Sequence, residues 1–237
     1  MIKNYSNISG LLLLDKPYGI TSFDVVCEVK KNLNVKKVGH CGTLDPIATG
    51  LLIILIGNAT KLQNYFMSKD KIYKSSFLIG VVTDSYDLYG NIISKNSIVN
   101  INIEKIKTII KMFKGEIFQI PPMYSALKYK GKKLYELARQ GIEIKRKPRK
   151  IIIKRFDIVS FCKPLVNVNI LCSSGTYIRT IAYDLGNILG CGAIVKTLRR
   201  EKIGIFNVNN ALKIEDLNDI NKITKNLIPY EKLIKML

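Results

Sequence analysis

The chain has 237 residues, of which 47% are hydrophobic and 24% charged, and these proportions exclude a disordered chain. Its 38 Lys and Arg outnumber 18 Asp and Glu, which gives a formal net charge of +20. Such an excess favours a polyanionic partner, although it does not separate RNA from DNA or from an anionic membrane. The charge therefore indicates a class of partner and no reaction.

The cysteine and histidine content argues against a metal site. Five cysteines form no CxxC pair and the chain has a single histidine, so the usual zinc-ligand spacings are absent. An odd number of scattered cysteines is typical of reduced thiols, and we expect a cytoplasmic protein. The apolar runs 11–14 and 51–56 are far shorter than the roughly 20 residues of a spanning helix, so we expect no membrane segment.

The first quarter of the chain predicts a strand, a helix and a buried strand. The apolar run 11–14 ends in a Pro/Gly turn, which is typical of a strand. Residues 23–33 have apolar side chains at helical spacing, with Ser22 as the candidate N-cap. The continuous apolar run 51–57 predicts a strand that is buried on both faces. The segment before it, Gly39 to Gly50, is a loop that leads into this core.

The rest of the chain alternates helical and strand-like segments. The predicted elements are a helix at 58–66, a strand at 73–80, a loop at 83–90, a helix at 103–113, strands at 151–161 and 165–172, and a helix at about 180–189. One or two short helices are expected in 207–237. This alternation implies a mixed α/β or α+β sheet domain.

Residues 121–155 form a strongly basic stretch, with twelve basic residues against two acidic ones. One interpretation is a solvated, lysine-rich helix. The other is a mobile basic arm that grips phosphates, with Tyr124, Tyr129 and Tyr135 placed to stack on bases or to pack at its root.

The loop from Gly39 to Gly50 contains two candidate polar residues, Asp45 and His40. Pro46 moves Asp45 away from helical geometry, so that its carboxylate is presented from a fixed loop. That carboxylate can be a turn residue, an N-cap or a catalytic group, and the local sequence alone favours the turn. His40 has no nucleophile partner at a recognised spacing, so we expect a packed hydrogen-bonding residue or a contact to phosphate or base.

A second constellation of polar residues, Gly175 to Arg179, follows a predicted strand. If it lies at the strand end, Tyr177 and Arg179 project to the same side. An arginine placed there can hold a carboxylate through a two-pronged ion pair and keep it ionised. The alternative is an ordinary arginine on a surface strand.

Six short motifs carry the most specific signal. They are, in chain order, Gly39–Gly50, Gly57–Lys61, Lys71–Tyr73, Pro121–Lys128, Gly175–Thr180 and Leu198–Arg200. Their composition and order resemble the bacterial TruB family of tRNA pseudouridine synthases, as does Lys16-Pro17, a structural motif beside the site. The resemblance covers roughly residues 10–206.

The resemblance implies an α+β pseudouridine synthase fold, with a mixed, mostly antiparallel central sheet flanked by helices and loops, and a basic arm that clasps RNA. It implies isomerisation of the T-loop uridine of tRNA, position 55, to pseudouridine by base flipping, without metal or organic cofactor. Asp45 then matches the catalytic nucleophile, Tyr73 the tyrosine that stacks on the target base, and Arg179 the arginine paired with the aspartate. The residues that match contacts to flipped-out nucleotides or the pocket lining are His40, Tyr177 and Leu198.

The resemblance also sets expected domain limits. Residues 1–206 are expected to form the catalytic domain, with the basic arm at about 121–155, and residues 207–237 a short C-terminal helical extension. Many family members continue into a PUA-type RNA-binding domain, for which the residues after Phe206 are too few. We expect tRNA as the partner, no protein partner, and a monomer.

Three other functions fit parts of the pattern. A non-catalytic RNA-binding protein shares the arm, yet Asp45, Tyr73 and Arg179 are all present. A hydrolase with Asp45 as nucleophile would call for further acidic residues around it to hold Mg²⁺. A guide-RNA-dependent uridine isomerase shares the fold, but the motifs are of the bacterial type.

Overall fold

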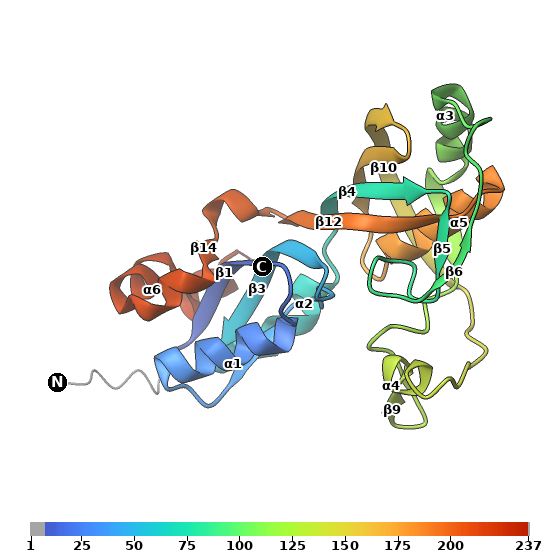
Figure 1. Ribbon diagram of the computed structural model, residues 1–237. Helices are drawn as coiled ribbons and strands as arrows, with labels where there is room; N and C mark the ends of the chain where they lie inside the picture. The colour runs from blue at the N-terminus through green and yellow to red at the C-terminus, as the bar shows by residue number, and fades with distance from the viewer. Residues whose placement is uncertain (1–7, 237) are drawn as a thin grey trace. The chain divides into compact units, whose positions relative to one another are not determined.

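The computed structural model describes residues 8–236. Contacts divide the chain into two units, drawn in Figure 1. Unit 1 contains the described residues 8–71 and 199–236, and unit 2 contains Ile72–Leu198. Strand β12 (Ala193–Ile203) contributes its first part to unit 2 and its last part to unit 1.

Unit 1 is built on strand β1 (Gly10–Lys16), which pairs antiparallel with β3 (Ala48–Ile56). Its other strands are β2 (Val38–His40), β13 (Phe206–Asn207), β14 (Leu212–Lys213) and β15 (Ile228–Pro229). Its helices are α1 (Ser22–Leu33), α2 (Gln63–Met67), α6 (Ile220–Asn226) and α7 (Tyr230–Ile234), with 3-10 turns at Gly57–Leu62, Val208–Asn210 and Ile214–Asn218.

Strand β3 is the most deeply buried element of unit 1. All residues from Leu51 to Ile56 have 0% of their surface exposed. Alternate side chains enter two different clusters: Leu51, Ile53 and Leu55 pack with the α2 side, and Leu52, Ile54 and Ile56 pack against α1. This is the period-two alternation of a strand with a hydrophobic layer on each face. The predicted two-sided burial of this strand is confirmed.

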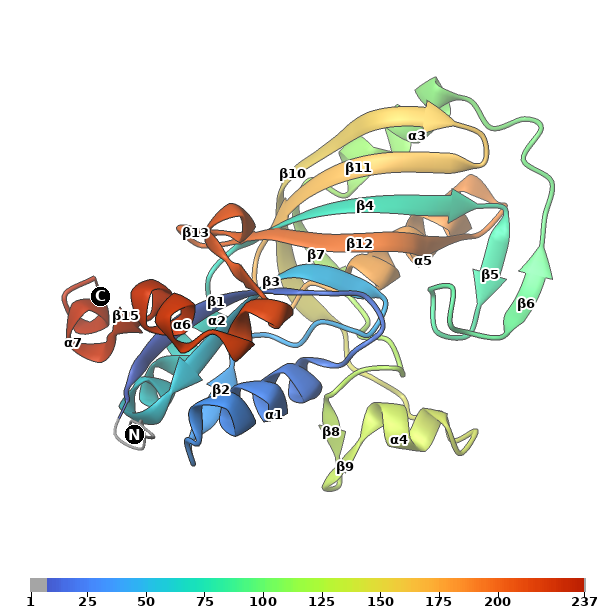
Figure 2. The same cartoon turned by 60° about the vertical axis from the view of Figure 1, so that its left-hand side comes forward.

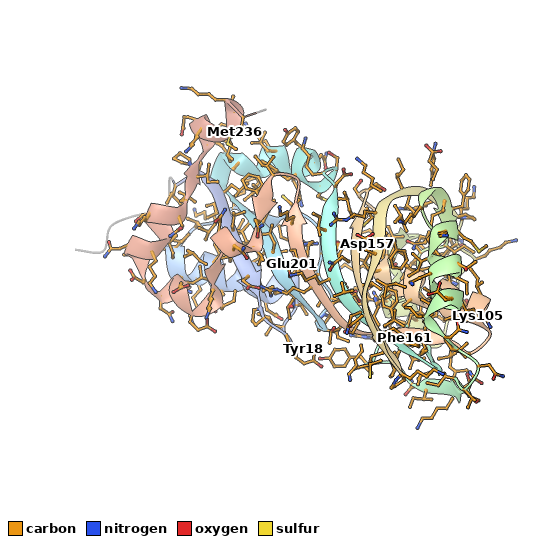
Figure 3. All side chains as sticks on the ribbon, turned by 90° about the horizontal axis from the view of Figure 1, so that it is seen from above. Tyr18, Lys105, Asp157, Phe161, Glu201 and Met236 are labelled. Carbon is orange, nitrogen blue, oxygen red and sulfur yellow. The ribbon has the colours of Figure 1, made fainter. Side chains whose placement is uncertain are left out.

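Unit 2 is a twisted sheet whose strand order is β12, β4 (Lys71–Ile79), β11 (Leu165–Cys172), β10 (Arg149–Cys162), β7 (Gly115–Gln119). Helices α3 (Ile103–Met112) and α5 (Ile178–Leu189) accompany it, together with the hairpin β5 (Val81–Thr83) and β6 (Ile92–Lys95). Strands β10 and β11 form a long antiparallel hairpin, on which Asp157 and Phe161 lie (Figure 3). The core contains Phe156, whose ring meets Phe77 and Phe113 edge-on.

The basic stretch contains a small folded module. Its elements are β8 (Lys128–Tyr129), β9 (Lys132–Lys133) and α4 (Leu134–Ala138), which project from the strands of unit 2 in Figure 2. Lys130 and Gly131 both have positive φ, as a tight two-residue hairpin turn requires. Met123, Leu134 and Leu137 form a separate apolar cluster beneath it. Residues 149–155 belong to β10, so the end of the predicted arm is part of the sheet.

The strand pairings confirm a mixed, mostly antiparallel sheet, in which β1 with β14 is a parallel pair. The segment 207–237 is more than the short helices predicted for it, because β14 and β15 pair with β1 and so belong to the unit 1 sheet. The expected limit at Phe206 therefore does not coincide with a unit boundary. Among residues 8–236, no helix is long and apolar enough to cross a membrane.

The core of unit 2 generates a stability prediction. Phe156→Ala removes a side chain that is 1% exposed and should cost about 3–5 kcal/mol of unfolding free energy, because a cavity replaces its ring contacts. Phe118→Ala on β7 is the matched control: that ring is 76% exposed, so the loss should stay below about 1 kcal/mol. Urea denaturation of the three proteins measures both values. Equal losses would contradict the assignment of Phe156 to the core.

Candidate active site

The loop between β2 and β3 presents Asp45. Its neighbours Leu44 and Ile47 are buried, with 3% and 2% exposure, whereas Asp45 is half-buried. The Ala48 amide donates to the Asp45 carbonyl at 2.9 Å, which closes a turn with Pro46 at its second position. The local turn chemistry thus agrees with the sequence, and the two buried neighbours fix the backbone on either side of the carboxylate.

Ser22 connects this loop to helix α1. The hydroxyl of Ser22 accepts a hydrogen bond from the Leu44 amide at 2.8 Å and donates to the Leu44 carbonyl at 3.1 Å. The prediction that Ser22 caps α1 is therefore wrong. Thr21 is the N-cap, in a reciprocal capping box with Asp24. Both residues have a capping side chain, and only the long-range contact to Leu44 distinguishes them.

The turn after β1 also contacts the loop. The Gly19 amide donates to the Pro46 carbonyl at 2.9 Å, and the exposed Tyr18 lies in the same turn (Figure 3). The buried Lys16 ammonium donates to the Pro17 and Ile20 carbonyls at 2.8 and 2.7 Å. Burial lowers the pKa of Lys16 to about 8, and the nearby Asp45 carboxylate partly opposes that shift. A titratable cation therefore lies near the candidate nucleophile.

His40 ends β2 at the start of the loop. Burial lowers its pKa below the ordinary 6.5, and the positive charge of Arg200 lowers it further, so the ring is neutral at pH 7. Its Nδ1 is buried without a hydrogen-bond partner among the described residues, while its carbonyl accepts from Gln63 at 3.0 Å. A neutral ring with an unused nitrogen fits a ligand contact better than an acid catalyst.

Tyr73 and Leu198 lie on the neighbouring strands β4 and β12 of unit 2. Both are buried, with 8% and 7% exposure. The Ser75 hydroxyl donates to the Thr197 carbonyl at 2.7 Å, which ties the two strands together close to both residues. The structure therefore brings these two predicted site residues into one region of the sheet.

Tyr177 and Arg179 do not lie at a strand end, so the condition under which they would project to the same side is not met. Strand β11 ends at Cys172, Tyr177 is the N-cap of α5 and Arg179 lies in its first turn. The two side chains therefore do not share a strand face. Gln119 holds the Tyr177 backbone by accepting from its amide at 2.8 Å and donating to its carbonyl at 3.0 Å.

The Arg179 guanidinium joins two separate segments of unit 2. It is 3% exposed and donates to the Ser85 carbonyl at 2.9 Å and to the Tyr124 carbonyl at 2.7 Å. Its Nε lies 3.7 Å from Oδ2 of Asp87, a buried carboxylate that the sequence analysis missed. The Asp/Tyr/Gly composition of loop 83–90 marked the segment, but no local pattern distinguished Asp87 from Asp84.

Comparison of the sequence with known proteins identifies the family. The family model described as TruB family pseudouridylate synthase (N terminal domain) matches residues 30–178, and tRNA pseudouridylate synthase B C-terminal domain matches 179–237. A protein named tRNA pseudouridine synthase B from Endomicrobium trichonymphae is 67% identical over 229 residues, covering 97% of this chain and 100% of its own. The chain belongs to the TruB family of pseudouridine synthases.

Two further matches agree with this assignment. A protein of the same name from Protochlamydia amoebophila is 48% identical, covering 94% of this chain and 85% of its own. A chain in the crystal structure of a Cbf5-Nop10-Gar1 complex superposes with a TM-score of 0.75 at 28% identity, over 99% of this chain and 63% of that one. These findings confirm the pseudouridine synthase fold. The two TruB family models meet between residues 178 and 179, so neither ends at the expected limit of 206.

No group of three or more His, Cys, Asp or Glu side chains among residues 8–236 is arranged to hold a metal ion. The polar groups in and next to the Gly39–Gly50 loop are the Asp45 carboxylate, the neutral His40 imidazole and two buried cations, Lys16 and Arg200. This set suits nucleophilic attack and anion binding.

The shifted pKa of Lys16 predicts a pH dependence of stability. Because its pKa is about 8 in the folded protein and 10.5 ordinarily, the unfolded chain binds more protons between these values. The Lys16 contribution to the unfolding free energy should therefore increase from pH 8 to 10.5. Lys16→Met removes it, so the difference between wild type and variant, measured by urea unfolding at several pH values, should rise over this interval. A constant difference would contradict the shift.

Proposed function

We propose that this chain isomerises a uridine of tRNA, the T-loop uridine at position 55, to pseudouridine. The observation that carries the proposal is the half-buried Asp45 in a braced loop of a TruB family chain. The curated relatives named above are tRNA pseudouridine synthases, and the net charge of +20 suits a polyanionic substrate. Six family motifs in the expected order support the same activity.

The reaction breaks the N1–C1′ glycosidic bond, turns the uracil and forms a C5–C1′ bond, while the proton on C5 is lost and N1 gains one. We assign Asp45 as the nucleophile, which divides this step into two easier ones. Tyr73 stacks on the flipped base, a contact that is worth roughly 1–3 kcal/mol for an aromatic ring. We assign Arg179 as the arginine paired with this carboxylate, whose role is to orient it. No cofactor is required in this scheme.

Three residues are assigned to the substrate contacts, namely His40, Tyr177 and Leu198. A neutral His40 donates or accepts one hydrogen bond without adding a charge, which suits a base edge. The buried Leu198 offers an apolar pocket wall, and the half-buried Tyr177 an aromatic face. The flipped nucleotide leaves its stack at a cost of a few kcal/mol, which such contacts can offset.

We assign the arm, residues 121–148, to the RNA backbone. The lysines of its β8–β9 hairpin are largely exposed, and the apolar cluster around Met123 and Leu137 gives the hairpin a fixed base. A preformed hairpin loses less conformational entropy when it binds than a flexible tail does.

We further propose that the protein acts as a monomer in the cytoplasm, without a protein partner. All five cysteines are free thiols, which suits a reducing compartment. Size-exclusion chromatography with light scattering tests the monomer, and a stable dimer would contradict it.

The nucleophile assignment predicts the outcome of one conservative substitution. Purified protein should release tritium from 5-tritiated uridine in an unmodified tRNA transcript, and Asp45→Asn should abolish release because an amide is not a nucleophile. Binding of the transcript, measured by filter retention, should stay within a few-fold because the side chain keeps its size. Wild-type release by Asp45→Asn would refute the assignment.

The arm predicts a change in the salt dependence of binding. Replacing Lys130, Lys132 and Lys133 with Gln should weaken tRNA binding and reduce the slope of log K against log salt by up to about 3, because up to three phosphate contacts are lost. The control replaces three lysines of the α3 region, Lys107, Lys111 and Lys114, which are exposed and lie outside the arm. Each of the two triple variants loses three positive charges. Equal slopes in both would place the phosphate contacts elsewhere.

A further inference from the structure

Arg200 is a buried cation directly beneath the loop that carries Asp45. It lies on the unit 1 part of β12 and is 1% exposed. Its Nε donates to the Leu51 carbonyl at 2.8 Å and its Nη2 to the Gly42 carbonyl at 2.9 Å. Both acceptors of the Arg200 guanidinium are main-chain carbonyls. Among the described residues no carboxylate forms an ion pair with it. The guanidinium thus joins the start of the loop to strand β3.

Two glycines of the loop lie against Arg200, and Gly50 leaves the space that its main chain needs. Gly50 has φ of +101°, and a Cβ at this position would collide with the Arg200 main chain. Gly42 has φ of +90°, and a Cβ there would lie 3.4 Å from Nη1 of Arg200. The glycines of one motif and the arginine of a motif 150 residues later therefore form a single packing unit.

The positive charge of Arg200 influences the pKa values of other groups around the loop. It contributes to the lowered pKa values of His40 and Lys16, in each case after burial, and it opposes the raised pKa of Cys41. All three residues flank the segment that presents Asp45. A positive charge at this depth favours an anionic group in the loop above it.

Packing alone does not account for an arginine at this position. A buried charge without an ionic partner is less favourable than an apolar side chain of similar size. What an arginine supplies is a planar group with donors in several fixed directions, so that one side chain reaches two carbonyls at once. The Leu51 and Gly42 carbonyls are bonded by two different nitrogens of this group, Nε and Nη2, and the single ammonium of a lysine cannot occupy both positions.

We propose that Arg200 is the positioning residue of the candidate active site: it holds the Asp45 loop against β3 and places a fixed positive charge beneath it. This inference rests on the proposed function, in which Asp45 is the nucleophile. Arg200 acts through the loop backbone, and it is distinct from Arg179, whose hydrogen bonds lie in unit 2.

The first test separates the geometry of Arg200 from its charge. Arg200→Lys keeps the charge and loses the two-carbonyl bridge, so kcat for tRNA should fall on the order of 10²-fold, as for a nucleophile displaced by about 1 Å. KM should stay within about threefold, because Arg200 itself bonds main-chain carbonyls and is not assigned to a substrate contact. A variant that keeps kcat within twofold of wild type overturns the proposal.

The second test uses the only histidine of the chain as a reporter. In untagged protein, the C2 proton of His40 gives one unambiguous NMR titration curve. Arg200→Gln should raise the pKa of His40, because the positive charge near it is lost. Arg200→Lys should leave that pKa near the wild-type value. Arg199→Gln is the matched control: it removes a charge from the adjacent residue, which pairs instead with Asp15 and with Glu201. Glu201 is labelled in Figure 3.

The outcomes of the two tests can be distinguished from a failure of the proposed function. Wild-type protein without tritium release would refute the proposed function, yet the His40 titration would still measure the charge of Arg200. An active wild type with a normal Arg200→Lys variant would refute the positioning role alone. A His40 pKa that is the same in wild type and Arg200→Gln would refute the electrostatic part. If Arg200→Gln does not fold, Arg200→Lys by itself decides the positioning.

Discussion

The burial of β3 on both faces is the constraint on which the candidate site depends. Each residue from Leu51 to Ile56 is fully buried, and alternate side chains belong to different clusters. A shift by one residue would exchange the two sets, so the register of the strand is strongly specified. The loop that precedes it therefore starts from a fixed point, and Asp45 is only three residues before the strand begins. A hydrophobic strand thus fixes the position of the loop that carries the candidate nucleophile.

Buried cations hold loops within each of the two units in a common way. Lys16 donates to two carbonyls of the turn after β1, Arg200 to carbonyls at the loop and at β3, and Arg179 to carbonyls of two loops in unit 2. In each case one buried side chain donates to two main-chain carbonyls and so fixes the backbone that carries them. The same residues thus order irregular backbone and create a positive potential that suits a polyanionic substrate.

Sequence patterns formed by residues close together in the chain predicted the positions of several helices and strands. The period of apolar residues located β3, α1 and α3, and the helix predicted at about 180–189 ends at Leu189, as α5 does. The errors occurred where a distant partner decides. Ser22 has the chemistry of an N-cap but is bound to Leu44, and the Gly175–Arg179 segment continues into a helix because Gln119 holds Tyr177 at its N-cap. Asp87 could not be singled out, because its importance comes from the position of Arg179 in another element.

The sequence by itself determined the family, the order of the elements and the identity of the candidate residues, because motif order and hydrophobic period are written along the chain. It also indicated a polyanionic partner, since net charge does not depend on the fold. Only the tertiary structure decided which side chains support the Asp45 loop. Ser22, Gly19 and Arg200 reach it from three elements separated by up to about 180 residues, and their hydrogen bonds exist only once β1, β3 and β12 are packed together in unit 1.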